Sequence, residues 1–219
     1  AVHRLQILDT PREQAYDDLV QLAAQVMRTP MATIGIIDGP RIWVKAKTDN
    51  VPFDEIPRSV SFCELAIVQD RTVLLADLRG DPELCTSQVV AGPPHLGSYL
   101  AVPLHSPDGV TLATLSVADV EPRAFSAEQI SWLEAVGRQV EQLFALRATL
   151  NERSADRDEA LQREARFRSV LQSLANGVIV YDNNGVIDDA NPSAETILGT
   201  TREMLIGETA LNAGAIHED

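Results

Sequence analysis

Hydrophobic and polar positions in the first 120 residues follow one helical pattern and then several short β-branched runs. Apolar residues recur at spacings of three and four from Ala15 to Val26, which predicts a helix over residues 11–27 with Thr10 as its N-cap. The runs MATIGIID and RIWVKAK flank Asp38-Gly39 and predict a β-hairpin. The remaining elements are predicted, in chain order, as a loop over 48–58, a short helix FCELAIV that Ser59 or Ser61 caps, a strand over 72–76, a helical turn over 84–90, and a second hairpin of strands 99–105 and 110–117. Strands joined by tight turns form an antiparallel sheet, so we expect an α+β fold in which helices flank a central sheet.

A long helical pattern follows this mixed region and begins with a capping box formed by Ser126 and Gln129. Its apolar residues recur at spacings of three and four, but the sequence becomes highly charged from residue 147 to residue 166. A helix this polar is too hydrophilic to pack as the core of a monomer, whereas two copies side by side would stabilise it, so we expect a homodimer. The residues expected to make the dimer contacts are Ile130, Leu133, Val136, Val140, Leu143 and Leu150.

Strand signals return near the end of the chain. The stretch GVIVYDNNGVIDDANP predicts a hairpin with Asn184-Gly185 at its turn. After it, SAETILG and TREMLIG predict two short helices that each end in glycine.

Net charge narrows the class of partner. A net charge of -14 provides no basic face for nucleic acid or an anionic membrane, so neither is expected as a partner. No apolar run approaches the roughly 20 residues of a membrane span, and the polar N-terminus has no apolar signal-peptide core. We therefore expect a cytoplasmic protein whose two cysteines, Cys63 and Cys85, are reduced thiols.

Residues 4–147 contain, in this order, ILDTPREQAYDDLVQLAAQVMRTPMATIGIID, SFCELAI, VLLADLRGDPEL, and GPP followed by SYLAVPLHSPDGVTLATLSVADVEPRAFS. Together these stretches resemble a GAF domain, in the subgroup found at the front of bacterial cyclic-di-GMP enzymes and sensor kinases. The chain departs from that subgroup at residues 113–116, where Ala-Thr-Leu-Ser replaces the usual Gly-Thr-Leu-Cys, and at Ser98, where an aromatic is usual. The resemblance therefore implies the fold and assigns no particular ligand.

The segment ARFRSVLQSLANGVIVYDNNGVIDDANPSAETILGTTREMLIG resembles the first half of a PAS domain. A whole domain of this kind needs about 100 residues, so the expected PAS-like part is incomplete. Together the two resemblances divide the chain into a GAF-like sensor domain (1–147), a charged helical linker (148–166), and the N-terminal part of a PAS-like domain (167–219). They also imply that the long helix is the signalling element of the module.

The GAF resemblance implies a ligand pocket between the sheet and the loops that cover it. Its expected lining is Trp43, Ser61, Cys63, Leu65, Asp77, His95, Tyr99 and Ala101. Across the family the ligands include cyclic nucleotides, tetrapyrroles, haem and small metabolites, and nothing in this sequence selects among them, so no cofactor is assigned. Cys63 is interpreted as a small packing residue of the pocket wall, or alternatively as a redox thiol at a helix N-terminus. His95 is interpreted as a surface residue, or alternatively as a pocket residue, and Asp77 as a loop-shaping residue.

Catalytic motifs are missing from the sequence. It contains no G-x-x-x-x-G-K, G-x-S-x-G, H-E-x-x-H or paired C-x-x-C pattern, and neither the GGDEF-type nor the EAL-type signature of the related output domains. We therefore expect no catalytic residue and no metal site, and interpret the chain as a non-catalytic sensory module. Its parent is expected to carry a diguanylate cyclase or cyclic-di-GMP phosphodiesterase as output domain. The alternatives are the input module of a sensor histidine kinase, a redox enzyme of the free methionine sulfoxide reductase type, and a dimerisation scaffold without a ligand.

Overall fold

The computed structural model describes residues 2–209, and the chain divides within one long helix into two units, residues 1–152 and 153–219. The helices are α1 (Val2–Leu5), α2 (Gln14–Met27), α3 (Cys63–Gln69), α4 (Gln88–Ala91), α5 (Ala127–Ser173), α6 (Pro192–Leu198) and α7 (Arg202–Leu205), with a 3-10 turn η1 (Arg58–Val60). The strands are β1 (Met31–Asp38), β2 (Arg41–Lys47), β3 (Glu55–Pro57), β4 (Val73–Leu75), β5 (Ser98–His105), β6 (Thr111–Asp119), β7 (Ile179–Tyr181) and β8 (Ile187–Ala190). No helix among residues 2–209 is both long and apolar enough to cross a membrane.

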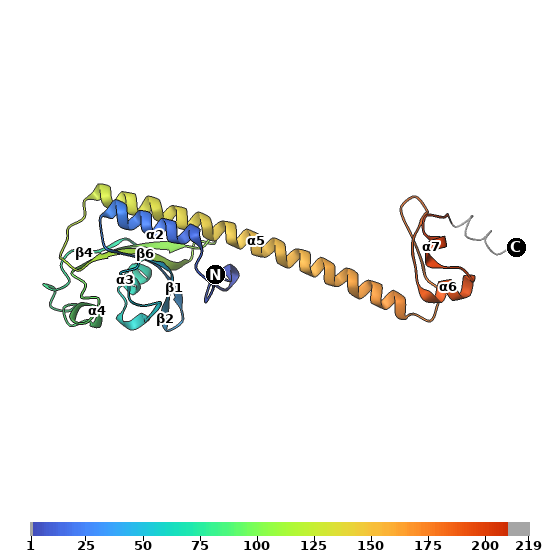
Figure 1. The fold of residues 1–219 in the computed structure, drawn as a ribbon, viewed down its shortest axis with the longest axis horizontal. Coiled ribbons are helices and arrows are strands. Elements are labelled where there is room, and N and C mark those ends of the chain that lie inside the picture. The colour runs from blue at the N-terminus through green and yellow to red at the C-terminus, as the bar shows by residue number, and fades with distance from the viewer. Residues whose placement is uncertain (1, 210–219) are drawn as a thin grey trace. The chain divides into compact units, whose positions relative to one another are not determined.

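A six-stranded sheet in the order β3-β2-β1-β6-β5-β4 forms the centre of the first unit. Every pairing is antiparallel, which confirms the expected α+β class. Helices α2 and α5 cover one face, and α3 and α4 lie on the other (Figure 1). Because side chains alternate along a strand, β5 contributes Leu100 to the core beneath α2 and α5 and Tyr99 to the core beside α3.

Two local predictions in this unit are wrong. Helix α2 begins at Gln14 with Glu13 as its N-cap, because the Thr10 hydroxyl donates to the carbonyl of Ile7 and accepts from Lys45 instead of capping the helix. The predicted loop over 48–58 contains the edge strand β3, which pairs with residues 41–43 of β2. Proline is tolerated in β3 because an edge strand leaves one side unpaired.

An irregularity in the β1–β2 pairing brings a lysine into the core. Ile34 pairs with Ala46, but Gly35 pairs with Val44, so Lys45 is the extra residue of a β-bulge. Its side chain is fully buried, and its Nζ donates to Thr10 Oγ1 at 2.7 Å, to the Pro11 carbonyl at 2.9 Å and to Glu13 Oε1 at 2.5 Å.

Arg147 of α5 donates to the same Glu13 carboxylate as Lys45. Its guanidinium donates to both carboxylate oxygens of Glu13, at 2.8 and 3.0 Å, and to the carbonyls of Leu5 and Gln6. Burial by itself raises the pKa of Glu13, but Lys45 and Arg147 more than offset it and the pKa is lowered. The Glu13 network, defined here as Lys45, Glu13 and Arg147, thus ties β2, the start of α2 and the N-terminal segment to α5.

Helix α5 begins as predicted, since Ser126 and Gln129 exchange the two hydrogen bonds of a capping box. It crosses β5 at Gly137, where an added Cβ would lie 3.2 Å from the side chains of both Val102 and Leu104. The absence of a side chain therefore permits close approach of helix and sheet.

The dimer contacts expected along α5 need correction. Leu133, Val136 and Val140 are buried in the core of their own chain, so they cannot face a partner without unfolding that core. Ile130 and Leu143 are partly buried against the same core, and Leu150 is exposed.

In the second unit, β7 and β8 form the expected hairpin, with Gly185 in a left-handed conformation at its turn. Asn191 organises the connection from this hairpin into α6. Its Oδ1 caps α6 by accepting from the Ala194 amide and also accepts from the Val178 amide, while its Nδ2 faces three backbone carbonyls between residues 171 and 176. A small core of Ile187, Ala190, Ala194 and Leu205 joins the hairpin to α6 and α7.

Candidate functional site

A cavity of about 50 Å³ lies between the sheet and α3, and we call it the α3 cavity. The middle strands of the sheet form its floor, and the residues before and at the start of α3 form one wall. It is lined by Thr33, Gly35, Ile42, Val44, Phe53, Ile56, Ser61, Phe62, Cys63, Val89, Leu96, Tyr99 and Ser116. An adjoining hollow of similar volume shares Thr33, Phe53, Leu96, Tyr99 and Ser116 with it.

Cys63 and Tyr99 meet in the lining of the α3 cavity. Cys63 is the first residue of α3, and its amide donates to the hydroxyl of Ser61 at 3.2 Å. The Sγ of Cys63 lies 3.2 Å from the hydroxyl oxygen of Tyr99. The ring centres of Tyr99 and Phe62 are 5.6 Å apart. Burial raises the pKa of Tyr99 well above 10, with a smaller contribution from Cys63, so its hydroxyl stays protonated at neutral pH.

Three further hydroxyl groups lie on the same face of the sheet. Thr33 of β1 and Ser116 of β6 are cross-strand partners whose hydroxyl oxygens are 2.7 Å apart. Thr114 of β6 is fully buried, and its hydroxyl lies close enough to that of Tyr99 to lower the pKa of Tyr99, an effect that burial of Tyr99 outweighs. This hydroxyl lies 3.8 Å from the point where a Cβ of Gly35 would be, and Gly35 lines the α3 cavity.

The structure brings together three of the eight predicted pocket residues, Ser61, Cys63 and Tyr99. Trp43 lies on the opposite face of the sheet, where Lys45 Nζ is 5.7 Å from its ring centre. The other four also lie outside the lining of the α3 cavity: Leu65, Asp77, His95 and Ala101.

Loop and packing contacts explain the positions of those four residues. Exposed Asp77 accepts hydrogen bonds from the amides of Arg79 and Gly80, as its predicted loop-shaping role requires. His95 is exposed with a left-handed φ of 62°, and its carbonyl accepts from Arg79. Leu65 and Ala101 belong to the apolar core around the cavity.

Thr33, Gly35 and Ser116 line the cavity although they were not among the predicted residues. A signal for them exists in the sequence, because small or hydroxyl residues alternate with large apolar ones at residues 33–36 (Thr-Ile-Gly-Ile) and 114–117 (Thr-Leu-Ser-Val). In a strand with two covered faces, this alternation marks one face as more polar than the other.

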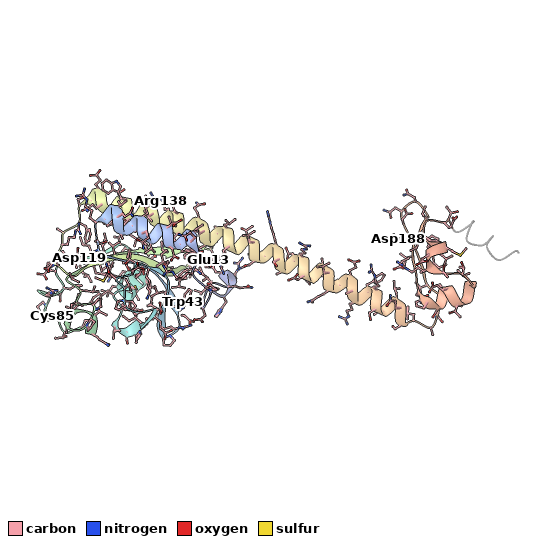
Figure 2. All side chains as sticks on the ribbon, in the orientation of Figure 1. Glu13, Trp43, Cys85, Asp119, Arg138 and Asp188 are labelled. Carbon is pink, nitrogen blue, oxygen red and sulfur yellow. The ribbon has the colours of Figure 1, made fainter. Side chains whose placement is uncertain are left out.

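The two cysteines have separate surroundings. Cys63 is buried against Tyr99, whereas Cys85 is half-buried in the loop before α4, near the margin of the first unit (Figure 2). Both are free thiols. Within residues 2–209, no cluster of three or more His, Cys, Asp or Glu side chains is arranged to hold a metal ion.

A hydrogen-bonded cluster at the sheet edge connects α3 with α5, and we call it the edge network. His105, the last residue of β5, has its Nδ1 2.7 Å from Glu141 Oε1 on α5 and its Nε2 2.9 Å from Asp70 Oδ1 at the end of α3. Thr111 also donates to Asp70. Nearby, Thr72 donates to Glu134 of α5 at 2.8 Å.

These contacts alter the pKa values of His105 and Asp70. Burial lowers the pKa of His105, but hydrogen bonds and charge from Glu141 and Asp70 outweigh it, so the pKa is raised. The pKa of Asp70 is lowered, first by the hydrogen bond from Thr111 and then by that from His105. The imidazolium form therefore strengthens the link between the two helices.

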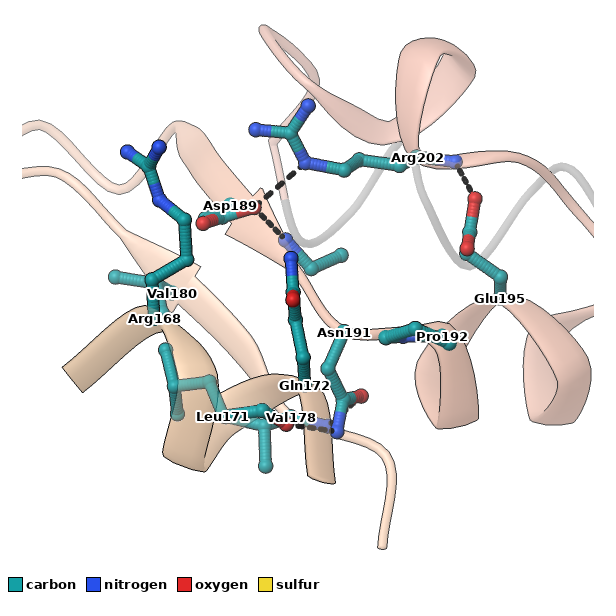
Figure 3. A pocket seen from close by; sticks show the side chains of 11 residues that line it. Arg168, Leu171, Gln172, Val178, Val180, Asp189, Asn191, Pro192, Glu195 and Arg202 are labelled. Atoms are coloured by element: carbon teal, nitrogen blue, oxygen red, sulfur yellow. Dashed lines mark hydrogen bonds and ion pairs between the residues drawn. The ribbon is translucent and has the colours of Figure 1, made fainter. Parts of the chain in front are cut away.

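The second unit contains a larger cavity of about 330 Å³ among the end of α5, the hairpin and α6 (Figure 3). Its charged side chains already pair with protein groups. Arg202 donates to Asp189 at 2.7 Å, which lowers the pKa of Asp189, and Arg168 donates to Glu164 at 3.1 Å. The cavity is therefore strongly polar, in contrast to the α3 cavity.

Each of the two units contains a region that matches a known family. The family model for the GAF domain matches residues 11–144, and a PAS domain model matches residues 165–218. A cyclic di-GMP phosphodiesterase of Pseudomonas aeruginosa is 31% identical over 150 residues, which is 68% of this chain and 25% of that protein. The chain thus spans a quarter of the length of this curated relative.

Solved structures share the fold of the first unit. The GAF domain of an Acinetobacter phosphoenolpyruvate-protein phosphotransferase superposes with a TM-score of 0.51 at 19% identity, covering 65% of this chain and 89% of that one. The free methionine-R-sulfoxide reductase of Neisseria meningitidis, solved with its substrate, gives 0.51 at 14% identity, covering 70% and 88%. At such identities the likeness concerns the fold alone.

Proposed function

Since this chain belongs to the GAF domain family, we propose that it is the sensory and regulatory part of a bacterial cyclic-di-GMP signalling protein. The observation that carries this proposal is the 31% identity, over 68% of the chain, to a cyclic di-GMP phosphodiesterase. A PAS domain match behind the GAF domain agrees with a multidomain sensor. The regulated output, a diguanylate cyclase or cyclic-di-GMP phosphodiesterase domain, would lie outside these 219 residues.

The arrangement of the first unit supports a route from the α3 cavity to α5. Cys63 starts α3 at the cavity, and Asp70 ends the same helix at the edge network, where His105 joins it to Glu141 of α5. A ligand that displaces α3 would therefore alter the hydrogen bonds that hold α5. Such a ligand shifts the equilibrium between two packings only by its difference in affinity for them.

The exposed side of α5 supports a homodimer. Leu146 and Leu150 are 57% and 55% exposed, and half-buried Leu143 precedes them at the same three-and-four spacing. Trp132, 44% exposed, lies two heptads before Leu146, and the polar residue Gln139 occupies the position between them. Apolar residues at heptad spacing form the seam of two-stranded coiled coils, so the partner proposed for this side of α5 is a second copy of the chain.

The reductase alternative has little support in the site. It would require cysteines that act together, whereas Cys63 contacts Tyr99 and Cys85 contacts the Pro82 carbonyl in a different loop. A histidine kinase output remains the second proposal, because a sensory module of this kind would serve either output.

Light scattering of the purified chain tests the proposal. We expect a dimer that Leu150→Glu converts to a monomer, because burying two carboxylates in an apolar seam is costly. Val68→Glu is the matched control, since Val68 is also on a helix and is 69% exposed. A monomeric wild-type chain, or equal effects of both substitutions, would contradict the dimer. In the full-length protein, Leu150→Glu should change the rate of cyclic-di-GMP synthesis or hydrolysis, and an unchanged rate would contradict the regulatory role.

A further inference from the structure

Residues 2–10, which we call the N-terminal strap, pack on the last part of α5 that belongs to the core of the first unit. Leu5 and Ile7 of the strap are fully buried in the same core as Phe144 and Ala148. Ala148 is the last buried residue of α5, and every residue from 152 to 170 is exposed. The strap therefore lies where α5 changes from a packed helix to a solvent-exposed one.

Side chains of α5 hold the strap by its backbone. Arg147 donates to the carbonyls of Leu5 at 2.6 Å and Gln6 at 2.9 Å. Asn151 Nδ2 donates to the carbonyls of Arg4 at 3.1 Å and Leu5 at 2.9 Å. The last carbonyls of a helix have no partner within that helix, and a single turn such as α1 has little stability of its own. The folded strap and the packed part of α5 therefore depend on each other.

Charged contacts hold the two ends of the strap. Near its start, Arg4 pairs with Glu152 of α5 and, at 2.7 Å, with Asp108 in the turn between β5 and β6. Near its end, Asp9 accepts hydrogen bonds from Arg41 of β2 at 2.8 and 3.0 Å. Arg4, Asp108 and Glu152 are each more than half exposed, and ion pairs in that setting add little stability. These contacts position the strap without fixing it firmly.

The backbone of the strap is strained at two residues. Gln6 and Asp9 have φ angles of 46° and 54°, which lie in the left-handed region. This region is unfavourable for residues with a Cβ, and asparagine and aspartate tolerate it better than glutamine does. The Gln6 side chain is exposed and forms no hydrogen bond with any group of residues 2–209, so it does not offset the strain. Such conformations persist only where surrounding contacts impose them, and they are common in segments that switch.

We propose that the N-terminal strap is a releasable clasp on α5. When docked, it holds residues 144–152 of the helix in the core of the first unit. When released, it loses its strain and frees this part of α5, while the six-stranded sheet stays folded. The release is a property of this chain alone, whereas its effect on an output domain rests on the regulatory role proposed above.

Native-state hydrogen exchange of the intact chain measures the release residue by residue. The Gln6 amide, which donates to the His3 carbonyl at 3.2 Å, reports on the strap, and the amides of residues 145–152 report on α5. We expect both to exchange through a common opening that leaves the amides of β5 and β6 protected. Asn151→Ala removes two hydrogen bonds to the strap and should lower the protection factors of both by about tenfold.

A second variant changes the strap in the opposite direction. Gln6→Asn keeps a polar side chain but suits the left-handed conformation better, so it should raise the same protection factors by roughly threefold. Asn50→Ala is the matched control, because Asn50 also donates to a backbone carbonyl, at 3.2 Å, but contacts neither the strap nor α5. It should leave the protection of both segments unchanged.

Several results would overturn the clasp. One is exchange of the strap and of residues 145–152 only by the global unfolding that also opens the sheet. Another is a response of the strap to Asn151→Ala without a response of α5, and a third is the absence of opposite effects from Asn151→Ala and Gln6→Asn.

Repeating the measurement with Leu150→Glu present separates the clasp from the dimer, since a partner chain would also protect this part of α5. We expect the same responses in that background, and their loss there would assign the protection to the partner and overturn the clasp. Light scattering of the dimer does not depend on these exchange rates, so failure of the clasp would leave the proposed function intact.

Discussion

Replacing Glu13 by glutamine should destabilise the first unit strongly. Glu13 is the carboxylate shared by Lys45, whose side chain is fully buried, and Arg147, which is 22% exposed. Removing one partner of a buried ion pair costs about 3–5 kcal/mol, because the remaining charge stays buried without compensation. Glu13 itself is 40% exposed, and Lys45 keeps two neutral acceptors, so we expect a loss of about 2–4 kcal/mol.

Tryptophan fluorescence during thermal or urea unfolding measures this loss specifically, because both tryptophans of the chain, Trp43 and Trp132, belong to the first unit. The expected loss corresponds to a fall in Tm of roughly 5–10 °C. Glu55→Gln is the matched control: Glu55 pairs with Arg41 at the surface, where an ion pair contributes about 0–1 kcal/mol. The reasoning would be refuted if the two substitutions had equal effects.

Two extensions of this experiment test the cause of the effect. Adding Lys45→Met to Glu13→Gln removes the uncompensated cation, so the double variant should be less destabilised than the sum of the single variants. The pKa of Glu13 is lowered in the folded chain, so its contribution is present above the ordinary glutamate pKa and is lost as the pH falls through the folded value. The difference between wild type and Glu13→Gln should therefore shrink in acid.

Further predictions concern the edge network and the second unit. The pKa of His105 is raised by folding, so its contribution to stability is present below about pH 6.5 and is lost as the pH rises through the folded value. The free energy of unfolding of His105→Gln, followed by fluorescence, should therefore differ most from that of wild type near pH 6 and least near pH 9. A difference that stays constant with pH would contradict this role of His105. In the second unit, Asn191→Ala should lower the free energy of unfolding by about 2–4 kcal/mol, because the Asn191 side chain caps α6 and hydrogen-bonds to both sides of the loop before β7. Hydrogen exchange should show reduced protection across residues 178–198, whereas Asn184→Ala at the exposed hairpin turn should leave it unchanged.

Periodic segments of the chain were predictable because their local sequence pattern and their packing in the fold favour the same type of secondary structure. The β1–β2 and β5–β6 hairpins follow from β-branched runs around turn residues, and the start of α5 follows from Ser126 and Gln129. Short elements that depend on a partner were not predictable. Strand β3 has no periodicity of its own and exists because it pairs with β2.

Side-chain direction was the main source of error at the candidate site. The bulge at Lys45 is invisible in the sequence, since it depends on the register between β1 and β2. The sequence predicts Trp43 in the pocket, whereas Ile42 and Val44, its neighbours in the strand, are the residues that line it. On α5, Leu133 and Val140 belong to an apolar stripe that predicts a dimer contact, but they are buried against the sheet of their own chain, because a stripe pattern alone does not distinguish a partner helix from that sheet.

The contact of α5 with β5 at Gly137 limits the movements by which the helix can carry a signal. The sheet presents the side chains of Val102 and Leu104 at 3.2 Å from the position of a Cβ, so any other residue at this point would have to displace them by a few tenths of an ångström. Sliding the helix by one residue would bring Val136 or Arg138 against these side chains, and rotating it about its own axis would do the same. Tilting the helix about Gly137 avoids this collision but moves Arg147 away from Glu13, so a movement of that kind has to break the Glu13 network.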